Sequence, residues 1–266
     1  MYAFTFSRPT TVRQAANILA KDEDAKLLAG GHTLLPTMKL RLAKPSQIVE
    51  MGLIEGLSGI EQSGRSLAIG AMTKHHEVND SPVVQQTIPV LAKLAGLIGD
   101  PAVRHRGTIG GSIANNDPAA DYPAALLALG ATIETNKRSV PADDFFKGLF
   151  TTALADGEII TAVSFPIPAK AGYAKFAHPA SRFALTGVFV AKTKSGDVRV
   201  AATGASQSGV MRLPAMEAAL KASWTASALD SVAISASGLL SDIHGSSDYR
   251  ANLIKVMAQR AVMAAG

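Results

Sequence analysis

Two glycine-rich segments constrain this 266-residue chain more than any other feature. The first is Ala29-Gly30-Gly31-His32-Thr33, and the second, much later in the chain, is Thr108-Ile109-Gly110-Gly111-Ser112. Each segment combines adjacent glycines with a hydroxyl side chain. Because glycine lacks a Cβ atom, the amide groups of such a turn can converge on an anion. Two turns of this kind on separate segments predict a cradle that holds a diphosphate from both sides.

The residues around the first glycine segment predict a strand, a turn and a helix in that order. Residues 26–29 form a short apolar strand, and a helix follows with Thr33 near its N-cap and Pro36 in its first turn. We expect this helix to include residues 38–42 and to end at Pro45. A strand that leads through a Gly-Gly turn to a helix amino terminus is typical of an anion site.

The remaining pattern divides the chain near residue 170. Strands and helices are mixed before Pro166-Ile167-Pro168, and an antiparallel meander of three strands followed by helices comes after it. Strands followed by helices predict a separate α+β unit. The other expected helices cover 11–21, 82–97, 124–129, 214–222, 227–237 and 248–264, and the other strands cover 47–51, 57–61, 66–70, 131–135, 158–166, 173–177, 184–193 and 198–203.

The composition excludes several classes of function. The chain has no cysteine, which fits a reducing compartment and removes thiolate nucleophiles and cysteine-bound zinc or iron–sulfur clusters. Its net charge is +5, but the basic residues are dispersed and only 5% of residues are aromatic, which argues against nucleic-acid binding. No secretory signal is visible, and the longest apolar stretch, residues 123–133, is too short for a bilayer. We expect a soluble, cytoplasmic protein with no membrane span, and the sequence leaves peripheral membrane association open.

Two familiar phosphate-binding patterns are absent. No two glycines are separated by a single residue, so the dinucleotide fingerprint G-x-G-x-x-G does not occur. Residues 59–66 have the spacing of a phosphate loop, but Arg65 stands where lysine is needed and a strand follows instead of a helix. We interpret residues 62–65 as the turn of a β-hairpin.

The histidines and acidic residues give weaker signals. His75-His76 lacks the H-E-x-x-H pattern and is interpreted as a surface pair near a loop, not a metal site. Residues 104–106, Arg-His-Arg, contribute either to an anion site or to an exposed loop. Asp117 and Asp121 could be acid–base groups, helix caps or acceptors for the hydroxyls of a sugar-like chain. No side chain is assigned as a proton-transfer catalyst.

The wider sequence around both glycine segments resembles the FAD-binding subunits of molybdenum hydroxylases, such as the medium subunits of aerobic carbon monoxide dehydrogenase and the flavin domain of xanthine dehydrogenase. The similar segments cover nearly the whole chain. They are residues 29–36 with 38–43, 106–114 with 117–121, 69–73, 182–184, 249–250 and 260–261. Asn115-Asn116 departs from the family pattern, which often has histidine there.

The resemblance implies an α+β architecture: a two-subdomain PCMH-type FAD-binding fold over residues 1–170, divided near residue 54, and a small C-terminal domain over 171–266. It implies that the amides of both glycine segments hold the diphosphate and that Asp121 binds the hydroxyl-bearing chain. Ile160 would pack on the flavin, and Lys175 would lie near its pyrimidine edge. The cofactor-binding residues implied in this way are Ala29, Gly30, Gly31, His32, Thr33, Leu34, Thr108, Ile109, Gly110, Gly111, Ser112, Asp121, Ile160 and Lys175.

The function implied by the resemblance is electron transfer. FAD in this chain would receive electrons from two 2Fe–2S clusters in a small partner subunit and pass them to an external acceptor, and a large partner subunit with molybdopterin would oxidise the substrate. A dimer of heterotrimers is the expected assembly. Two alternatives stay open: a stand-alone FAD-dependent oxidoreductase of the same fold, and a nucleotide-binding module without redox activity.

Overall fold

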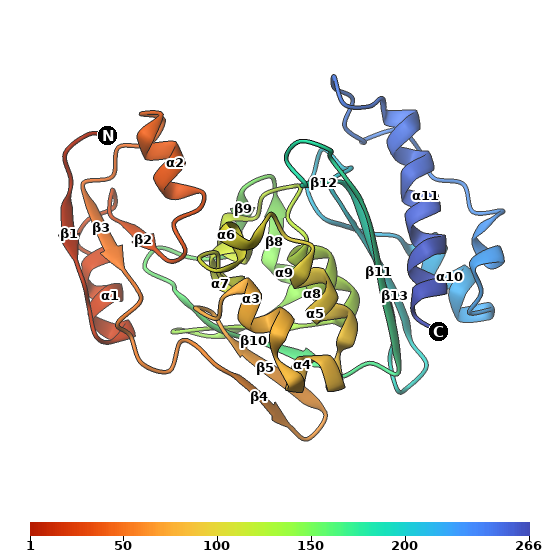
Figure 1. Cartoon of the computed structure of the whole chain (residues 1–266), viewed down its shortest axis with the longest axis horizontal. Coiled ribbons are helices and arrows are strands. Elements are labelled where there is room, and N and C mark those ends of the chain that lie inside the picture. The colour runs from red at the N-terminus through yellow and green to blue at the C-terminus, as the bar shows by residue number, and fades with distance from the viewer.

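The computed structural model describes all residues, 1–266, as three units arranged side by side (Figure 1). The chain begins at one end of the molecule and finishes near helix α11 at the other. Each unit contains one main β-sheet, and a separate two-stranded hairpin belongs to the middle unit. None of the helices combines the length and the apolar character needed to cross a membrane.

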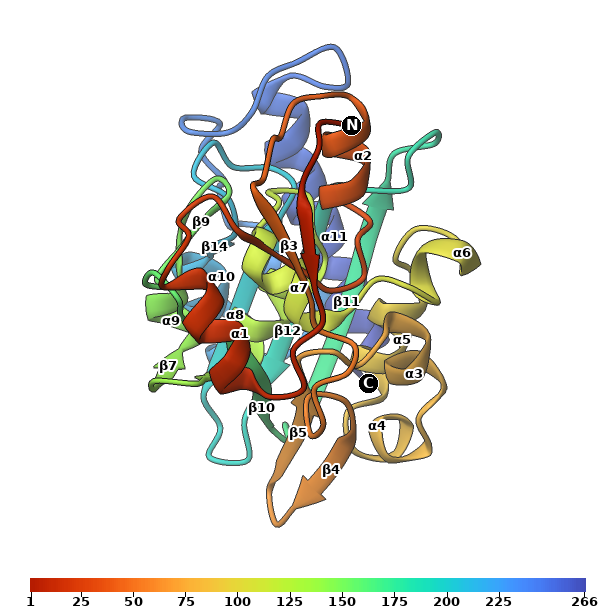
Figure 2. The ribbon, with the colours of Figure 1, turned by 90° about the vertical axis from the view of Figure 1, so that its left-hand side faces the viewer.

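The first unit is a small parallel sheet with strand order β1-β3-β2. Helix α1 begins after Thr11, whose side chain accepts a hydrogen bond from the amide of Gln14 and so caps the helix. Figure 2 shows this unit in front of the rest of the molecule. Its elements are β1 (Thr5–Ser7), α1 (Val12–Leu19), β2 (Lys26–Leu28), α2 (Leu34–Lys39) and β3 (Gln47–Glu50).

The second unit is an antiparallel sheet of order β4-β5-β10-β6-β7 covered by short helices. All eight residues of α8 are buried, which is typical of a helix enclosed on every side. The strands are β4 (Ile60–Ser63), β5 (Ser66–Gly70), β6 (Thr132–Thr135), β7 (Ser139–Pro141), β8 (Phe146–Gly148), β9 (Thr151–Thr152) and β10 (Ile160–Pro166). The helices are α3 (His75–Asp80), α4 (Pro82–Thr87), α5 (Pro89–Gly96), α6 (Pro101–Arg104), α7 (Ile109–Asn115), α8 (Tyr122–Leu129) and α9 (Ala142–Phe145).

The third unit is an antiparallel sheet of order β11-β12-β13-β14. Tyr173, Phe189 and Ala201 are neighbours across three strands, and all three belong to the main apolar core together with α8. The opposite face of the sheet packs against α10 and α11 in a second core. The elements are β11 (Lys170–Ala177), β12 (Ala184–Lys192), β13 (Val198–Thr203), β14 (Met211–Arg212), α10 (Pro214–Ala222), the 3₁₀-helix η1 (Ala226–Leu229) and α11 (Ser247–Ala264).

The expected α+β class and the C-terminal antiparallel meander are confirmed, and the meander gains the short fourth strand β14. The expected hairpin is also present between β4 and β5, but Ser63 pairs with Ser66, so its turn lies one residue later than expected. The helix expected over 82–97 is two helices, because Pro89 begins α5 and leaves Ile88 outside the helical region. The second helix of the chain stops at Lys39 instead of reaching residue 42.

The helix expected over 227–237 is wrong. After η1, residues 230–237 form no regular helix, and alternate side chains, those of Val232, Ile234 and Ala236, pack against the second core. Such a period of two is that of an extended chain, not of a helix. The short helix α3 was not expected at all.

Candidate cofactor site

A cavity of about 880 Å³ lies where the three units meet, a size suited to a large ligand. It is lined by both glycine segments, by residues 98–100, by the start of β10 and by the loop of residues 180–183. Every expected cofactor-binding residue except Ile109 lines it. These are Ala29, Gly30, Gly31, His32, Thr33, Leu34, Thr108, Gly110, Gly111, Ser112, Asp121, Ile160 and Lys175.

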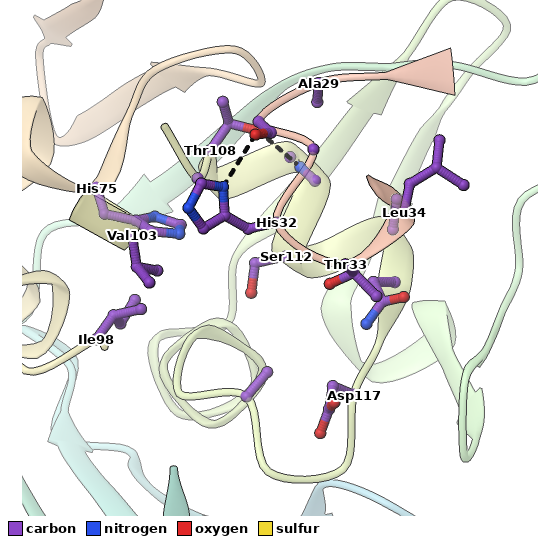
Figure 3. Close-up of a pocket in the computed structure, with 18 of the residues that line it drawn as sticks. Ala29, His32, Thr33, Leu34, His75, Ile98, Val103, Thr108, Ser112 and Asp117 are labelled. Carbon is purple, nitrogen blue, oxygen red and sulfur yellow. Dashed lines mark hydrogen bonds between the residues drawn. The ribbon is translucent and has the colours of Figure 1, made fainter. Parts of the chain in front are cut away.

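The first glycine segment presents unused backbone donors. Gly31 has φ +72°, a conformation that glycine adopts without strain, and it turns the chain from β2 into α2. The amides of residues 30–34 donate no hydrogen bond within the chain. Nδ1 of His32 donates to the Gly30 carbonyl at 3.1 Å, which holds the imidazole beside the turn (Figure 3). This segment therefore has the donors that a diphosphate requires.

The second glycine segment differs from the expected turn because it is the first turn of α7. Oγ1 of Thr108 caps the helix by accepting from the Gly111 amide at 3.1 Å. The amides of Ile109 and Gly110 donate to the carbonyls of Thr73 and Ala71, and the amide of Ser112 donates to Thr108. All four amides are thus engaged within the chain. The segment instead presents the Ser112 hydroxyl to the cavity (Figure 3), whereas Ile109 is fully buried in the main core.

A buried ion pair also lines the cavity. Nζ of Lys175 is 3.0 Å from the Asp121 carboxylate, and the two side chains are 3% and 4% exposed. Nζ also donates to the Leu97 carbonyl, and Asp121 accepts a hydrogen bond of 2.6 Å from the Tyr173 hydroxyl. Burial raises the pKa of Asp121, against the opposing effects of Lys175 and Tyr173. The carboxylate thus holds Lys175 at the cavity wall, and each of its oxygens retains a further lone pair.

His75 was expected at the surface, and that interpretation is wrong. It begins α3, is 4% exposed and lines the cavity close to His32 and Val103 (Figure 3). Burial, followed by the nearby His32, lowers the pKa of His75 to about 4, so its imidazole is neutral at pH 7. The amide of Lys74 donates to the Glu77 carboxylate at the start of α3, but lysine is not a usual N-cap residue, so no local pattern marked this helix.

The structure also shows where other residues with open alternatives lie. Arg104, His105 and Arg106 do not line the cavity, and the latter two are exposed, which favours the loop interpretation. Asp117 lines the cavity and accepts from the amide of Ala119, so it stabilises its own loop. Asn116 adopts φ +45° and its Nδ2 donates to the carbonyls of Gly148 and Thr151, which fixes the β8–β9 hairpin.

Comparison with known proteins identifies the family. The sequence model of the FAD-binding domain in molybdopterin dehydrogenases matches residues 2–168. The chain belongs to this family. This chain is 36% identical to the nicotine 6-hydroxylase medium subunit of Paenarthrobacter nicotinovorans, and the match covers 99% of this chain and 98% of that relative. It is also 36% identical to the carbon monoxide dehydrogenase medium chain of Hydrogenophaga pseudoflava, over 98% of this chain and 96% of that relative.

Solved structures of related proteins have the same fold as this chain. Carbon monoxide dehydrogenase from Oligotropha carboxidovorans superposes with a TM-score of 0.92 at 33% identity, covering 99% of this chain and 98% of that one. Quinoline 2-oxidoreductase from Pseudomonas putida 86 superposes with a TM-score of 0.88 at 32% identity, covering 99% of this chain and 97% of that one. The resemblance expected from the glycine segments is therefore confirmed, with its fold, and this family member is a flavoprotein subunit of the molybdenum-containing oxidoreductase type.

The residues of the cavity fit FAD, the cofactor of the family. Consecutive free amides at residues 30–34 suit a diphosphate. The apolar Ile160 and Leu154 suit a planar aromatic ring, and the buried cation of Lys175 suits its electron-rich polar edge. Four acidic residues also line the cavity. Asp121 is paired with Lys175 and Glu158 with Arg138, whereas Asp100 caps α6 and Asp117 accepts from the Ala119 amide.

Proposed function

We propose that this chain carries the electrons of a molybdenum hydroxylase from the iron–sulfur clusters of a small partner subunit, through FAD, to an external acceptor. The observation that carries the proposal is the run of free amides at residues 30–34 on the wall of a cavity large enough for a dinucleotide. The family membership over nearly the whole chain supports it. Bound FAD supplies the redox chemistry, and the protein binds and orients it.

The proposed contacts follow from the position of each residue. The amides of residues 30–34 and the Ser112 hydroxyl would bind the diphosphate, and Thr108 would support them by capping α7. Asp121 would use its remaining lone pairs for a hydroxyl of the cofactor chain. Ile160 would pack on the flavin ring, and the charge of Lys175 would lie at the pyrimidine edge.

The proposed partners are an iron–sulfur subunit and a molybdopterin subunit, in a dimer of heterotrimers in the cytoplasm. Support comes from the relatives, which are named as medium subunits or medium chains, a term that implies smaller and larger companions. The chain itself has no cysteine with which to hold a cluster. In the same proposal, the chain folds as domains over residues 1–54, 55–170 and 171–266.

The test is to purify the full chain, alone and from its native source, and to record its absorbance spectrum. We expect one FAD per chain, released on denaturation, and copurification with an iron–sulfur chain and a molybdenum-containing chain. Reduction of the partner clusters by substrate should bleach the flavin absorbance. A flavin-containing chain that never associates with partners would indicate the stand-alone oxidoreductase. A colourless chain that cannot be reconstituted with FAD would refute the proposal.

A further inference from the structure

The backbone of Gly107 fills the narrow space between the first glycine segment and helix α3. A Cβ atom built on Gly30 would lie 2.3 Å from the Arg106 carbonyl oxygen and 2.6 Å from Cα of Gly107. A Cβ built on Gly107 would lie 2.6 Å from Nε2 and 2.8 Å from Cδ2 of His75. Gly107 is therefore packed between Gly30 and the imidazole of His75, and neither glycine has room for a methyl group.

The imidazole of His75 cannot easily give way. The backbone amide of His75 donates to the Gly107 carbonyl at 3.0 Å, and Lys74 and Thr108 form a β-bridge beside it. The ring centroid of His75 lies 5.5 Å from that of Tyr122, which is fully buried in α8. Since the buried Nδ1 of His75 has no hydrogen-bond partner, packing against Tyr122 and Gly107 holds the ring. Tyr122, His75, Gly107 and Gly30 thus form one continuous row of contacts.

This row crosses the boundary between the first two units. The helices and strands of the first fifty residues pack mainly among themselves and make little contact with those of the second unit. A small apolar cluster that includes Ile54, Leu57 and Ile159 joins the units. Beside the cavity, the contact of Gly30 with residues 106–107 joins them directly. The spacing of the two glycine segments therefore depends on what supports Gly107 from behind.

We propose that His75 is a positioning residue of the cofactor site: it supports Gly107 against Gly30 and so sets the distance between the two glycine segments. The role is distinct from binding the cofactor by hydrogen bonds, and it rests on the proposed function only for the identity of the ligand. Because packed interiors transmit small displacements, a shift of the loop at residues 106–108 moves Thr108 and the start of α7 together.

The test is a double-mutant cycle with His75→Ala and Gly107→Ala in the full chain freed of FAD, measuring the dissociation constant of added FAD by quenching of flavin fluorescence. Each single substitution should weaken binding at least about tenfold, Gly107→Ala by overpacking and His75→Ala by removing the support. In the double variant the new methyl group occupies space left by the imidazole. The double variant should therefore bind FAD at least as tightly as His75→Ala, and the two dissociation constants should differ by no more than about threefold.

The matched control is Val78→Ala, a truncation of another fully buried side chain on the same helix. It should lower the melting temperature about as much as His75→Ala and leave FAD affinity within about twofold of the wild type. Additive effects of the two test substitutions, or equal loss of affinity in the control, would overturn the positioning role while leaving wild-type FAD binding intact. Failure of the wild type to bind FAD would count against the proposed function. Non-additive melting temperatures in the FAD-free proteins would still show the coupling of His75 to Gly107.

Discussion

Replacing Lys175 by methionine should destabilise the FAD-free chain strongly at neutral pH and much less in acid. The substitution keeps most of the side-chain volume but leaves Asp121, 4% exposed, without its cation. Loss of one partner of a buried ion pair costs about 3–5 kcal/mol. The hydrogen bond from Tyr173 remains and offsets part of this cost, so we expect a loss near the lower end, about 3 kcal/mol.

The pH dependence follows from the direction of the Asp121 pKa. Burial already raises this pKa, and removing Lys175 removes the main influence that lowers it. A carboxyl whose pKa is higher in the folded than in the unfolded state binds a proton more tightly when folded. The variant therefore regains stability as the pH falls below the folded pKa and keeps its full loss above it.

The assay is urea-induced unfolding of the FAD-free wild type and variant between pH 5 and pH 8. Lys93→Met is the control, because Lys93 is exposed and makes no ion pair, and it should change stability by less than about 0.5 kcal/mol. The double variant Asp121→Asn/Lys175→Met should recover much of the loss. A loss for Lys175→Met below about 1 kcal/mol, or one that does not vary with pH, would show that the pair is not buried as described.

Three further predictions concern other parts of the site. His75 has a pKa of about 4 in the folded protein against 6.5 when unfolded. The free energy of unfolding of the wild type should therefore fall by up to about 3 kcal/mol as the pH drops from 6.5 to 4. Urea titrations of His75→Gln should show a weaker dependence on pH. Glu158 is held by Arg138 with a pKa of about 2. Because Arg138 is half exposed, Glu158→Gln should cost only about 1–2 kcal/mol at pH 7, and this cost should disappear as the pH falls through about 2. Asn116→Ala should release the β8–β9 hairpin and accelerate chymotrypsin cleavage at the exposed Phe150, whereas Asn116→Gly, which accepts φ +45°, should show only the part due to the lost hydrogen bonds.

The first glycine segment was predictable because its information is local. A strand, two glycines and a helix start follow one another within a few residues, and the backbone alone determines that the amides of residues 30–34 are free. The second segment was only half predictable. The amides of Ile109 and Gly110 are occupied by the carbonyls of Thr73 and Ala71, which are distant in sequence, and no local pattern shows such partners.

The roles of single side chains depended on contacts that a pattern does not contain. Lys175 and Asp121 were both expected at the site, yet their pairing joins β11 to the start of α8 and appears only in three dimensions. His75 was misplaced because adjacent histidines look polar, whereas the burial of this one follows from Tyr122 and Gly107 on separate elements. The segment at 227–237 was misread because alternating small apolar and serine residues fit a helix or an extended chain equally well by composition.

The neighbouring residues Tyr173, Phe189 and Ala201 of the third sheet limit how the protein can be truncated or recombined. The segment that matches the family ends at residue 168, just before β11, and that position looks like a natural place to truncate. However, these three residues belong to the same apolar core as α8. A fragment ending at residue 168 would therefore expose a wholly apolar helix to water and should aggregate. Exchange of C-terminal segments between relatives should likewise succeed only when the residues facing α8 are exchanged with them.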